Sequence, residues 1–372
     1  MRIAIIGKKY PFCGIVTYCR ELIRALRAQG HTVAFYYLHN EEVHEENEDG
    51  LPYLLRTHVY IVPQGDAKQR LAEQLRQFKP DVVHASFALS FLDFALPDIC
   101  DALGVPLVVT FHAAYDRRPS LHNRLSGMVY RMYARTLARA DRVIIFSEPQ
   151  RRRLATLGVD SRRVTVLPNG VDAQRYRPGG STFKSEIRAR RLLAYMGRID
   201  PEKNVGPMLK IVTGLELPKD VHLAVMGDGV LANKLKPRYA DHPQIHWLGF
   251  VEDEERRIDV LRGADIFVLP STIEGLSLAL LEAMACGAAP IATDVGADAE
   301  VIQGCGTIID PGRLDEQLGP AVLAMLEDDR RLAALQAGAR RRVVSRYAMR
   351  RNIDRLLEVY EEARRPTWRL AR

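Results

Sequence analysis

The segment "DIFVLPSTIEGLSLALLEAMACGAAPIAT" (residues 265–293) contains a complete strand–helix–strand pattern. Its first apolar run, at 265–269, predicts a strand, and the proline- and glycine-bounded stretch 270–275 predicts a loop. The following segment, 276–287, predicts a helix whose final glycine is a suitable stop. A β-branched run at 290–293 predicts the next strand. Two strands joined by a helix are typical of a parallel pair with a crossover connection.

The same alternation recurs along the whole chain, which predicts an α/β fold with two doubly wound parallel sheets. The expected strands lie at residues 2–6, 32–38, 59–62, 81–85, 107–111, 142–146, 164–167, 192–196, 222–226, 245–248, 265–269 and 290–293. The expected helices lie at residues 15–29, 68–78, 121–139, 205–213, 252–262, 276–286, 314–326 and 348–363.

The chain length predicts two domains, because 372 residues is long for one domain of about 100–200 residues. The stretch "LPNGVDAQRYRPGGS" (167–181) is rich in proline and glycine and is the expected linker. We therefore expect domains at 1–168 and 169–347, with the helix in 348–372 crossing back to the first domain. Ligands of open α/β sheets bind beyond the carboxyl ends of the strands, so a site is expected in loops that follow strands.

The composition is that of an ordinary globular protein, with 47% hydrophobic and 27% charged residues. No apolar run approaches the roughly 18 residues of a membrane span, and the first, at 3–6, is too short for a signal peptide. A cytoplasmic protein is therefore expected. The five cysteines are scattered, without Cys-x-x-Cys pairs or histidines at metal-ligand spacing, so structural thiols and no metal site are expected.

Positive charge is concentrated in one region of the chain. Residues 117–163 contain twelve arginines, no lysine and three acids, a net charge of +9. Since the whole chain carries +7, the remainder sums to −2. A local basic patch suggests a phosphate-rich partner, such as an anionic membrane surface or a nucleic acid.

The strand-to-helix turn in "LLAYMGRIDPEKN" (192–204) brings two cations together. An apolar strand runs into Gly197, and Arg198 and Lys203 bracket the turn before the next helix. Free N–H groups at a helix N-terminus favour negative charge, so the two cations would converge there on an anion such as a diphosphate. Taken alone, the pattern is also that of two solvated cations on a turn.

A second strand-to-glycine turn follows in "HLAVMGDG" (222–229). Its Gly227 would let the backbone approach a ligand closely, because glycine has no side chain in the way. Ordinary turns use Gly-x-Gly as well, so this motif is weak evidence.

Two glutamates, Glu274 and Glu282, stand eight residues apart in the opening segment. Glu274 falls in the loop after the strand and Glu282 nearly two turns into the helix, so both can face the expected cleft. A carboxylate accepts two hydroxyl hydrogen bonds at once, which suits polyols such as a ribose and a second sugar. The loop N–H groups of Gly275, Leu276 and Ser277 could also meet phosphate. The alternative is structural: charge compensation at the helix N-terminus for Glu274 and a buried salt bridge for Glu282.

The combination of these motifs resembles the family-4 retaining glycosyltransferases of the GT-B fold. The resemblance rests on the Glu-x7-Glu pair, on "GRIDPEKN" (197–204), on "LPNGVD" (167–172) and on "HWLGFV" (246–251), which come in the family's order and spacing. The motifs cover most of residues 164–302. The GT-B fold implies two Rossmann-like domains facing across a cleft, the first binding the acceptor and the second the nucleotide sugar.

The resemblance also implies a role for each site residue. Arg198 and Lys203 would hold the donor diphosphate and stabilise its charge as it leaves. Glu282 would bind the ribose, Glu274 would bind hydroxyls of the transferred hexose, and Leu248–Val251 would form the base-binding wall. The favoured donor is a UDP-sugar. In such enzymes the sugar is transferred with retention and without a metal or other cofactor, because protein cations and helix termini replace the ion.

The N-terminal half resembles the family in two segments. The first, "GKKYPFCGIVTYCREL" (7–22), resembles a loop that normally carries a Gly-Gly pair near the diphosphate, but here only Gly14 remains, preceded by Cys13. The second, "VVTFHAAYD" (108–116), resembles the strand-end histidine segment, in which His112 would face the donor sugar. The alternative for a lone histidine at a strand end is a structural role.

The segment "LHNRLSGMVYRMYARTLARADR" (121–142) predicts a basic amphipathic helix. Its arginines fall within about an 80° arc at 100° per residue, and they are Arg124, Arg131, Arg135, Arg139 and Arg142. The adjoining apolar stripe is Leu121, Leu125, Met128 and Met132, with Tyr130 and Tyr133 at its margin. Such a helix can lie on an anionic bilayer, with Arg124, Arg131, Arg135 and Arg139 as the membrane-binding residues. The alternative is a helix that packs its apolar side on the sheet.

Family-4 enzymes that glycosylate lipids often carry such a helix, so the expected protein is a glycosyltransferase at the cytoplasmic face of a membrane. Its acceptor would be a glycolipid such as a glycosyl diacylglycerol. A soluble acceptor (a sugar phosphate, a polyol or a polysaccharide) is the alternative, since arginines also bind small phosphates. A nucleotide-sugar epimerase would need acid and base residues in the cleft, and a PLP-dependent phosphorylase would need a Schiff-base lysine. Only the arginine tract supports RNA binding, so no nucleic-acid partner is expected.

Overall fold

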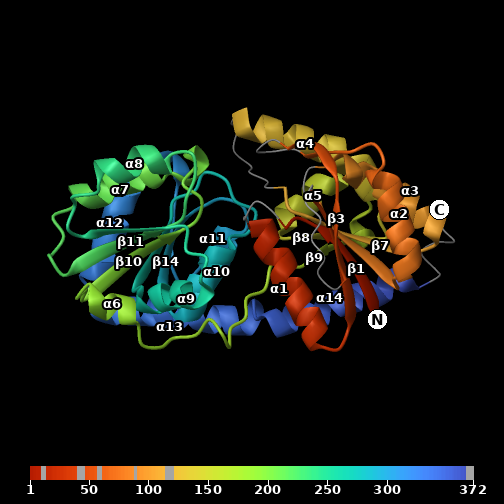
Figure 1. Ribbon diagram of the computed structural model, residues 1–372. Helices are drawn as coiled ribbons and strands as arrows, with labels where there is room; N and C mark the ends of the chain where they lie inside the picture. Colours follow the sequence, from red (N-terminus) through yellow and green to blue (C-terminus); the bar gives the residue numbers. More distant parts are fainter. Residues whose placement is uncertain (10–13, 40–46, 57–60, 88–89, 114–120, 366–372) are drawn as a thin grey trace. The chain divides into compact units, whose positions relative to one another are not determined.

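The computed structural model describes the chain except for residues 10–13, 40–46, 57–60, 88–89, 114–120 and 366–372, and omits the side chains of 55–56 and 121–126. The chain divides into two compact units (Figure 1). Unit 1 comprises Met1–Asn169 together with Arg350–Arg372, and unit 2 comprises Gly170–Met349. The boundary at Asn169 falls within the proline- and glycine-rich stretch 167–181.

Unit 1 is built on a seven-stranded sheet with the order β3-β2-β1-β6-β7-β8-β9, in which every neighbouring pair is parallel. Most of its strands are largely apolar, as expected for a sheet that helices cover on both faces. The bounds are β1 Arg2–Gly7, β2 Thr32–Leu38, β3 Glu48–Leu51, β6 Val82–Phe87, β7 Leu107–Phe111, β8 Arg142–Ile145 and β9 Val164–Val166.

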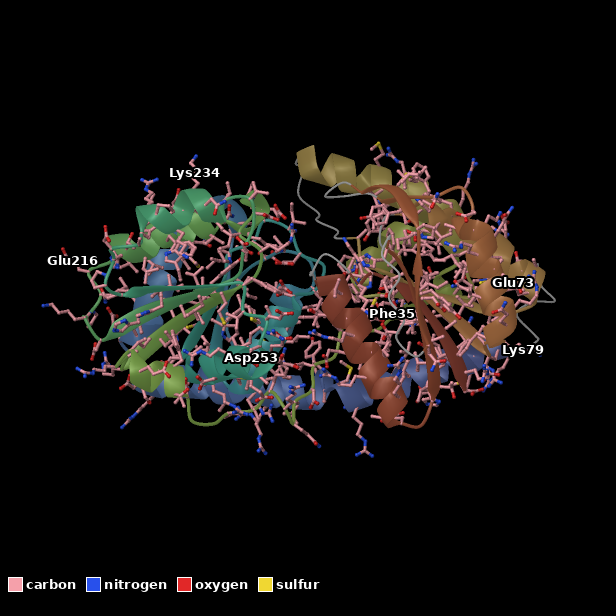
Figure 2. All side chains as sticks on the ribbon, in the orientation of Figure 1. Phe35, Glu73, Lys79, Glu216, Lys234 and Asp253 are labelled. Carbon is pink, nitrogen blue, oxygen red and sulfur yellow. The ribbon has the colours of Figure 1, made fainter. Side chains whose placement is uncertain are left out.

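Helices cover the two faces of the unit 1 sheet. One core contains buried residues of the strands and of α2 (Ala67–Phe78), α3 (Leu96–Leu103), α4 (Leu121–Arg139) and α5 (Glu148–Ala155). The helix α1 (Gly14–Ala28) contacts β1 and β2, with its buried residues at the i, i+3, i+4 and i+7 spacing of an amphipathic helix. Those residues are Val16, Cys19, Leu22, Ile23 and Leu26. Figure 2 shows Phe35 of β2 among the elements of this unit.

The helix α14 (Met349–Arg364) follows unit 2 in the chain but belongs to unit 1. Its apolar stripe of Ile353, Leu356, Val359, Tyr360 and Ala363 is buried. The hydroxyl of Tyr360 lies 2.5 Å from Nδ1 of His84, a fully buried residue of β6. The other ring nitrogen of His84 lies 2.7 Å from Oγ1 of Thr110 on β7. The helix is thus held to the sheet by apolar packing and by a buried polar contact.

Unit 2 is built on a six-stranded sheet with the order β12-β11-β10-β13-β14-β15, again parallel throughout. The bounds are β10 Arg191–Met196, β11 Val221–Met226, β12 Ile245–Gly249, β13 Ile266–Leu269, β14 Ala289–Thr293 and β15 Thr307–Ile309. Counted within the unit, the strands run 3-2-1-4-5-6, which is the order of a dinucleotide-binding sheet. The direction of winding therefore reverses between β10 and β13. The expected pair of doubly wound sheets is confirmed.

Two groups of helices cover the unit 2 sheet. One core contains apolar residues of α7 (Val205–Gly214), α8 (Ala232–Arg238) and α12 (Leu314–Leu326). Contacts to the strands are also made by α9 (Glu254–Gly263), α10 (Leu278–Cys286) and α13 (Asp329–Arg346). Figure 2 shows Glu216 and Lys234 pointing away from this unit into solvent.

The helix α10 is defined at both ends by its caps. It begins at Leu278, two residues later than expected, because Ser277 is the N-cap and its hydroxyl accepts the N–H of Leu280. It ends at Gly287, whose φ of 97° places it in the left-handed region that glycine adopts readily. Most of its length is buried, including Glu282. The expected stop is thus confirmed, and the expected start is corrected by the cap.

Candidate functional site

Two loops meet at the point where the unit 2 sheet changes direction. One follows β10 and carries Arg198 and Lys203, and the other follows β13 and carries Glu274. In sheets of this class the crevice at such a reversal is where ligands bind, beyond the carboxyl ends of the strands. The sequence motifs with the strongest chemical signal therefore lie at the position that the topology favours.

The carboxylate of Glu274 is held between the two loops. Its Oε1 lies 2.6 Å from Nζ of Lys203 and also accepts a hydrogen bond from Oγ of Ser271 at 2.8 Å. The side chains of Lys203 and Glu274 are 14% and 13% exposed, so the ion pair is largely shielded from solvent. Ser271 is a fully buried residue of the same loop, and its hydrogen bond helps to fix the position of the Glu274 carboxylate. Sequence reasoning did not single out this serine, which looks like an ordinary loop residue.

Backbone contacts bind the two loops to each other. The N–H and the hydroxyl of Thr272 donate to the carbonyl of Glu202, at 2.8 and 3.1 Å. In the other direction, the side-chain amide of Asn204 donates to the carbonyl of Pro270 at 3.0 Å. Asn204 adopts a φ of 51°, a left-handed conformation that asparagine tolerates better than most residues. The ion pair of Lys203 and Glu274 therefore sits on a rigid frame.

Arg198 has carboxylate partners within its own loop. Its guanidinium pairs with Asp200 and, at 2.6 Å, with Oε1 of Glu202. The side chain of Arg198 is 52% exposed, so it is also open to solvent. Asp200 in turn accepts the N–H of Val230, which ties this loop to the glycine-rich turn after β11. Arg198 and Lys203 thus share one loop, but each has a carboxylate partner of its own.

The glycines Gly197 and Gly227 allow two strand ends to approach. Gly227 has a φ of 142°, and a Cβ added there would lie 1.8 Å from the carbonyl oxygen of Gly197. The N–H of Gly197 donates to Met226 at 3.0 Å, and that of Gly227 to Gly249 at 2.7 Å. Contact between the protein's own backbone segments is therefore sufficient to explain why Gly227 is a glycine.

Glu282 lies in the second turn of α10 and is 8% exposed. Tyr176 lies near enough to Glu282 to feel its charge. Burial, and then the negative charges of Glu282 and Glu254, raise the pKa of the Tyr176 phenol. The hydroxyl of Tyr176 donates to Oε1 of Glu254 on α9 at 3.1 Å. Leu248 and Val251, at the carboxyl end of β12, are half-buried. Glu282 therefore has surroundings of its own, beside α9, in addition to its link through α10 to the Glu274 loop.

The N–H of Ser277 donates to Oδ1 of Asp298 at 2.9 Å, so this group is not directed at a ligand. The N–H of Ser277 thus has a partner within the protein, and its hydroxyl caps α10; a contact of Ser277 with the donor stays a prediction. For Gly275 and Leu276 the phosphate contact stays a prediction. Asp298 itself was missed by sequence reasoning, because an aspartate at the start of a short helix normally signals only a cap.

In unit 1, His112 follows β7 and lies against β6. Its Nε2 is 2.6 Å from Oγ of Ser86, and its ring meets that of Tyr18 edge to face, with centroids 4.9 Å apart. Burial lowers the pKa of His112 to about 3, so the imidazole is neutral at physiological pH. Gly14 is the first residue of α1, and a Cβ there would meet no atom of the described residues within 4 Å. Cys13 lies outside the described residues.

The helix α4 presents two different faces. Tyr130 and Tyr133, which we expected at the margin of the apolar stripe, are fully buried against the sheet because Phe111 packs against both rings. Met128 and Met132 are instead 61% and 43% exposed. The alternative, in which these methionines pack on the sheet, is therefore wrong.

The arginines of α4 also differ from one another. Arg131 and Arg135 are exposed beside the two methionines. Arg139 is paired with Asp98 and Asp101 of α3, at 2.7 and 2.8 Å, and so has local carboxylates that compete with any anionic surface. The side chain of Arg124 lies outside the described residues. The exposed surface defined by Met128, Arg131, Met132 and Arg135 is called the α4 surface below.

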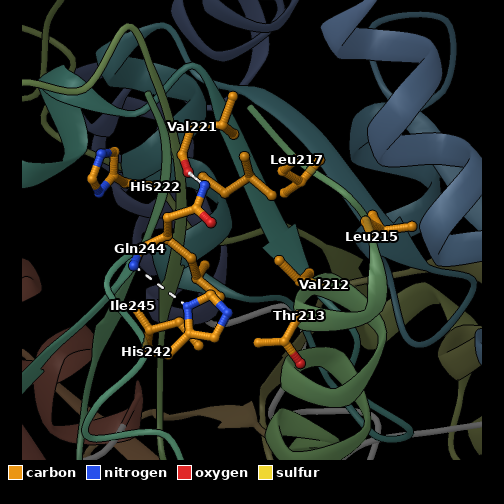
Figure 3. Close-up of a pocket in the computed structure, with 11 residues that line it drawn as sticks. Val212, Thr213, Leu215, Leu217, Val221, His222, His242, Gln244 and Ile245 are labelled. Carbon is orange, nitrogen blue, oxygen red and sulfur yellow. Dashed lines mark hydrogen bonds between the residues drawn. The ribbon is translucent and has the colours of Figure 1, made fainter. Parts of the chain in front are cut away.

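A small pocket opens at the opposite edge of the unit 2 sheet, near the amino ends of β10, β11 and β12 (Figure 3). Its volume is about 20 Å³, enough for about one water molecule. Gln244 crosses it, donating from its side-chain amide to the carbonyl of Val221 at 2.6 Å. Because ligands bind at the carboxyl edge in this class of sheet, this pocket is not part of the candidate site. Within the described residues, no helix combines the length and the apolar composition that crossing a bilayer requires.

Comparison with known proteins gives matches over both units. Residues 12–175 match the family described as Glycosyltransferase Family 4, and residues 190–328 match Glycosyl transferases group 1. An Escherichia coli relative, UDP-Gal:alpha-D-GlcNAc-diphosphoundecaprenol alpha-1,3-galactosyltransferase, is 26% identical over 78% of this chain and 77% of its own length. A D-inositol 3-phosphate glycosyltransferase of Geodermatophilus obscurus is 28% identical over 76% of this chain and 66% of its own length. The sulfoquinovosyl transferase of Arabidopsis thaliana is 28% identical over 85% of this chain, which spans 65% of it.

Solved structures share the fold over nearly the whole chain. HepE of Anabaena, crystallised with UDP and glucose, superposes with a TM-score of 0.78 at 16% identity, over 96% of this chain and 99% of its own. Sucrose-phosphate synthase of Thermosynechococcus elongatus gives 0.76 at 19% identity, over 97% and 98%. The two parallel sheets, the motif order and these matches agree. The chain belongs to the family-4 glycosyltransferases and has their GT-B fold.

Proposed function

We propose that unit 2 binds a nucleoside-diphosphate sugar, with UDP-sugars favoured, and that the enzyme transfers a hexose from it with retention of configuration. The family assignment supports one part of this proposal, the use of a nucleotide sugar. The observation that supports the proposed site most directly is the ion pair of Lys203 and Glu274, held across the point where the sheet changes direction. We take 169–347 as the donor-binding domain and 1–168 as the acceptor-binding domain.

The two cations would hold the diphosphate by exchanging partners. Lys203 is paired with Glu274, and Arg198 with Asp200 and Glu202. A diphosphate would replace one carboxylate contact of each cation, and the cations would then stabilise the negative charge that develops as the leaving group departs. Since they sit on a rigid loop, little reorganisation is needed at that moment.

The glutamates would hold the sugars. Ser271 and Lys203 both engage Oε1 of Glu274, so its second oxygen is directed by those two contacts and can accept a hydroxyl of the transferred hexose. Glu282, which lies near Tyr176, would bind the ribose, and Leu248–Val251 would form the wall beside the base. The backbone would also come close to the same ligand at four positions: Gly197, Gly227, Gly275 and Leu276.

In unit 1 we propose that His112 contacts the transferred sugar. Its neutral imidazole can hydrogen-bond a hydroxyl without adding charge, and Ser86 fixes the orientation of the ring. Gly14 would leave room for a ligand at the start of α1, because no described residue would contact a Cβ placed there.

The acceptor is proposed to be a lipid at an anionic membrane surface. The α4 surface supports this, since exposed methionines flanked by exposed arginines suit the boundary between headgroups and acyl chains. The name of the Escherichia coli relative includes a lipid acceptor, whereas that of the Geodermatophilus relative includes an inositol phosphate. A soluble acceptor is therefore the second candidate.

Thermal unfolding in the presence of UDP-, GDP- and ADP-sugars tests the donor assignment. A nucleotide that binds the folded state raises the unfolding temperature, by an amount that grows with the logarithm of its concentration divided by its Kd. We expect UDP-sugars to stabilise the wild type. The Glu282→Ala variant should be stabilised less, because its affinity for the UDP-sugar should be about 10- to 100-fold lower, as for loss of a hydrogen-bonded charge. No stabilisation by any nucleotide sugar would contradict the proposal. The anomeric configuration of the product, read by NMR, tests retention.

A further inference from the structure

The carboxyl group of Asp298 is buried next to the loop that carries Glu274. Asp298 is the first residue of α11 (Asp298–Ile302), just after β14, and its side chain is fully buried. Oδ1 accepts the N–H of Ser277 at 2.9 Å. Oδ2 is also buried, and it has no hydrogen-bond partner within the described residues. A buried polar atom without a partner costs free energy, so a carboxyl group here needs an explanation beyond packing.

The segment 296–298 clamps the Glu274 loop from the neighbouring strand end. The N–H of Ala297 donates to the carbonyl of Gly275 at 2.8 Å. Gly296 has a φ of 57°, and a Cβ there would lie 2.3 Å from the carbonyl oxygen of Glu274. Together with the contact of Asp298 to Ser277, these features fix both ends of the turn between Glu274 and the helix of Glu282.

Glu274 and Lys203 are the charged groups that act on Asp298. Burial, and then the negative charge of Glu274, raise the pKa of Asp298 well above its usual value, while the N–H of Ser277 and the cation of Lys203 oppose the rise. This shift favours the uncharged form of Asp298, and Lys203 has Glu274 as its carboxylate partner.

We propose that Asp298 is a positioning residue of the donor site: through its contact with Ser277 it holds the turn from Glu274 to α10, and so keeps Glu274 in place against Lys203. This inference rests on the proposed donor site in unit 2. It predicts that the hydrogen-bond acceptor at this position is needed, but that the negative charge is not. At high pH, ionised Asp298 would compete with Glu274 for Lys203 and disturb the site.

Two substitutions separate these contributions. Asp298→Asn keeps an oxygen for Ser277 and imitates the uncharged acid, so we expect UDP affinity within about 2-fold of the wild type. Asp298→Ala removes the acceptor, and we expect UDP binding weaker by about 5- to 30-fold, as for a lost buried hydrogen bond. Asp315→Asn, at an exposed carboxylate of α12, serves as the control with unchanged affinity.

The pH dependence distinguishes positioning from a purely structural role. We expect UDP affinity of the wild type to fall toward alkaline pH, and the affinity of Asp298→Asn to fall less. A residue that only packs the fold would change the unfolding temperature without changing this profile. If Asp298→Ala does not fold, as judged by circular dichroism, the profile of Asp298→Asn decides alone.

Calorimetric titration of UDP into the full-length protein carries the test. If the wild type binds no UDP, GDP or ADP, the proposed donor site itself fails, and the inference fails with it. If the wild type binds, the inference alone is overturned by a folded Asp298→Ala variant with wild-type affinity, or by an Asp298→Asn variant whose pH profile matches that of the wild type.

Discussion

The Nζ of Lys203 lies 2.6 Å from Oε1 of Glu274, and this contact joins the loops after β10 and β13. The carboxylate of Glu274 thus contacts the cation that is proposed to bind the diphosphate. Nucleotide binding and sugar transfer should therefore respond in opposite directions when the carboxylate is neutralised.

We expect Glu274→Gln to bind UDP about 3- to 10-fold more tightly, because a competing charge is removed from Lys203. Turnover with the UDP-sugar should fall by about 10- to 100-fold, since a charge-assisted contact to the sugar is lost. Calorimetry and initial rates measure the two effects. Glu216→Gln, at the exposed acid labelled in Figure 2, is the control. Weaker UDP binding by Glu274→Gln would contradict the proposed exchange of partners.

Removal of the cation should affect turnover more than binding. In Lys203→Ala we expect turnover to fall by about 100- to 1,000-fold, the range seen when one group that stabilises developing charge is deleted. The UDP dissociation constant should rise less, because Arg198 remains. Steady-state rates with Lys234→Ala, an exposed lysine of α8, provide the comparison. If the UDP dissociation constant rises by the same factor as the turnover falls, Lys203 contributes to binding of the donor and not specifically to the transition state.

The α4 surface makes a prediction about membranes. Charge reversal at Arg131 and Arg135 should abolish co-sedimentation with vesicles of phosphatidylglycerol and phosphatidylcholine, since each basic residue contributes about 1 kcal/mol near an anionic surface. The matched control reverses two charges elsewhere in unit 1, at Arg76 of α2 and at Lys79 beside it (Figure 2). If both double variants sediment as the wild type does, the soluble-acceptor alternative is favoured.

The buried His84 predicts how stability changes with acid. Burial, together with the nearby His112, lowers the pKa of His84 to about 3, whereas the unfolded chain has the ordinary value near 6.5. Between these values the unfolded state binds the extra proton, so stability is present above pH 6.5 and is lost as the pH falls. One such group changes the free energy of unfolding by about 1.4 kcal/mol per pH unit.

Urea unfolding between pH 5 and 6.5 checks this expectation. In His84→Gln the slope should be shallower by about 1.4 kcal/mol per pH unit. Tyr360→Phe removes the same contact to α14 and should lower stability by about 1–3 kcal/mol, but it keeps the buried histidine and therefore the slope. An unchanged slope in His84→Gln would show that this residue is not the proton acceptor.

Much of the fold could be predicted from local sequence pattern. The strands β2 and β7 and the helices α4 and α12 have the expected bounds, because buried parallel strands are continuous apolar runs and long helices have clear periodicity. The strand β3, "EDGL" (48–51), was missed because it is short and carries two acids. The helix α13 was missed because only Leu332, Ala339 and Val343 are buried, too few for a clear stripe.

The site could be predicted only as far as loop position determines it. Lys203 and Glu274 were identifiable because each lies in a loop just after an apolar strand, and their contact then follows from the strand order. The contact of Ser277 with Asp298, and the pairing of Arg198 with Glu202, depend on side-chain directions that no spacing rule contains. The burial of Tyr130 and Tyr133 likewise depends on which face of α4 meets Phe111.

Because α14 belongs to unit 1 but is encoded after unit 2, the order of translation differs from the order in space. The ribosome releases the strands of the first sheet early, and the helix that covers His84 only after unit 2. On the nascent chain, unit 2 can therefore reach its complete set of elements before unit 1 does. Until then, the sheet face awaiting Tyr360 stays exposed to water and to chaperones.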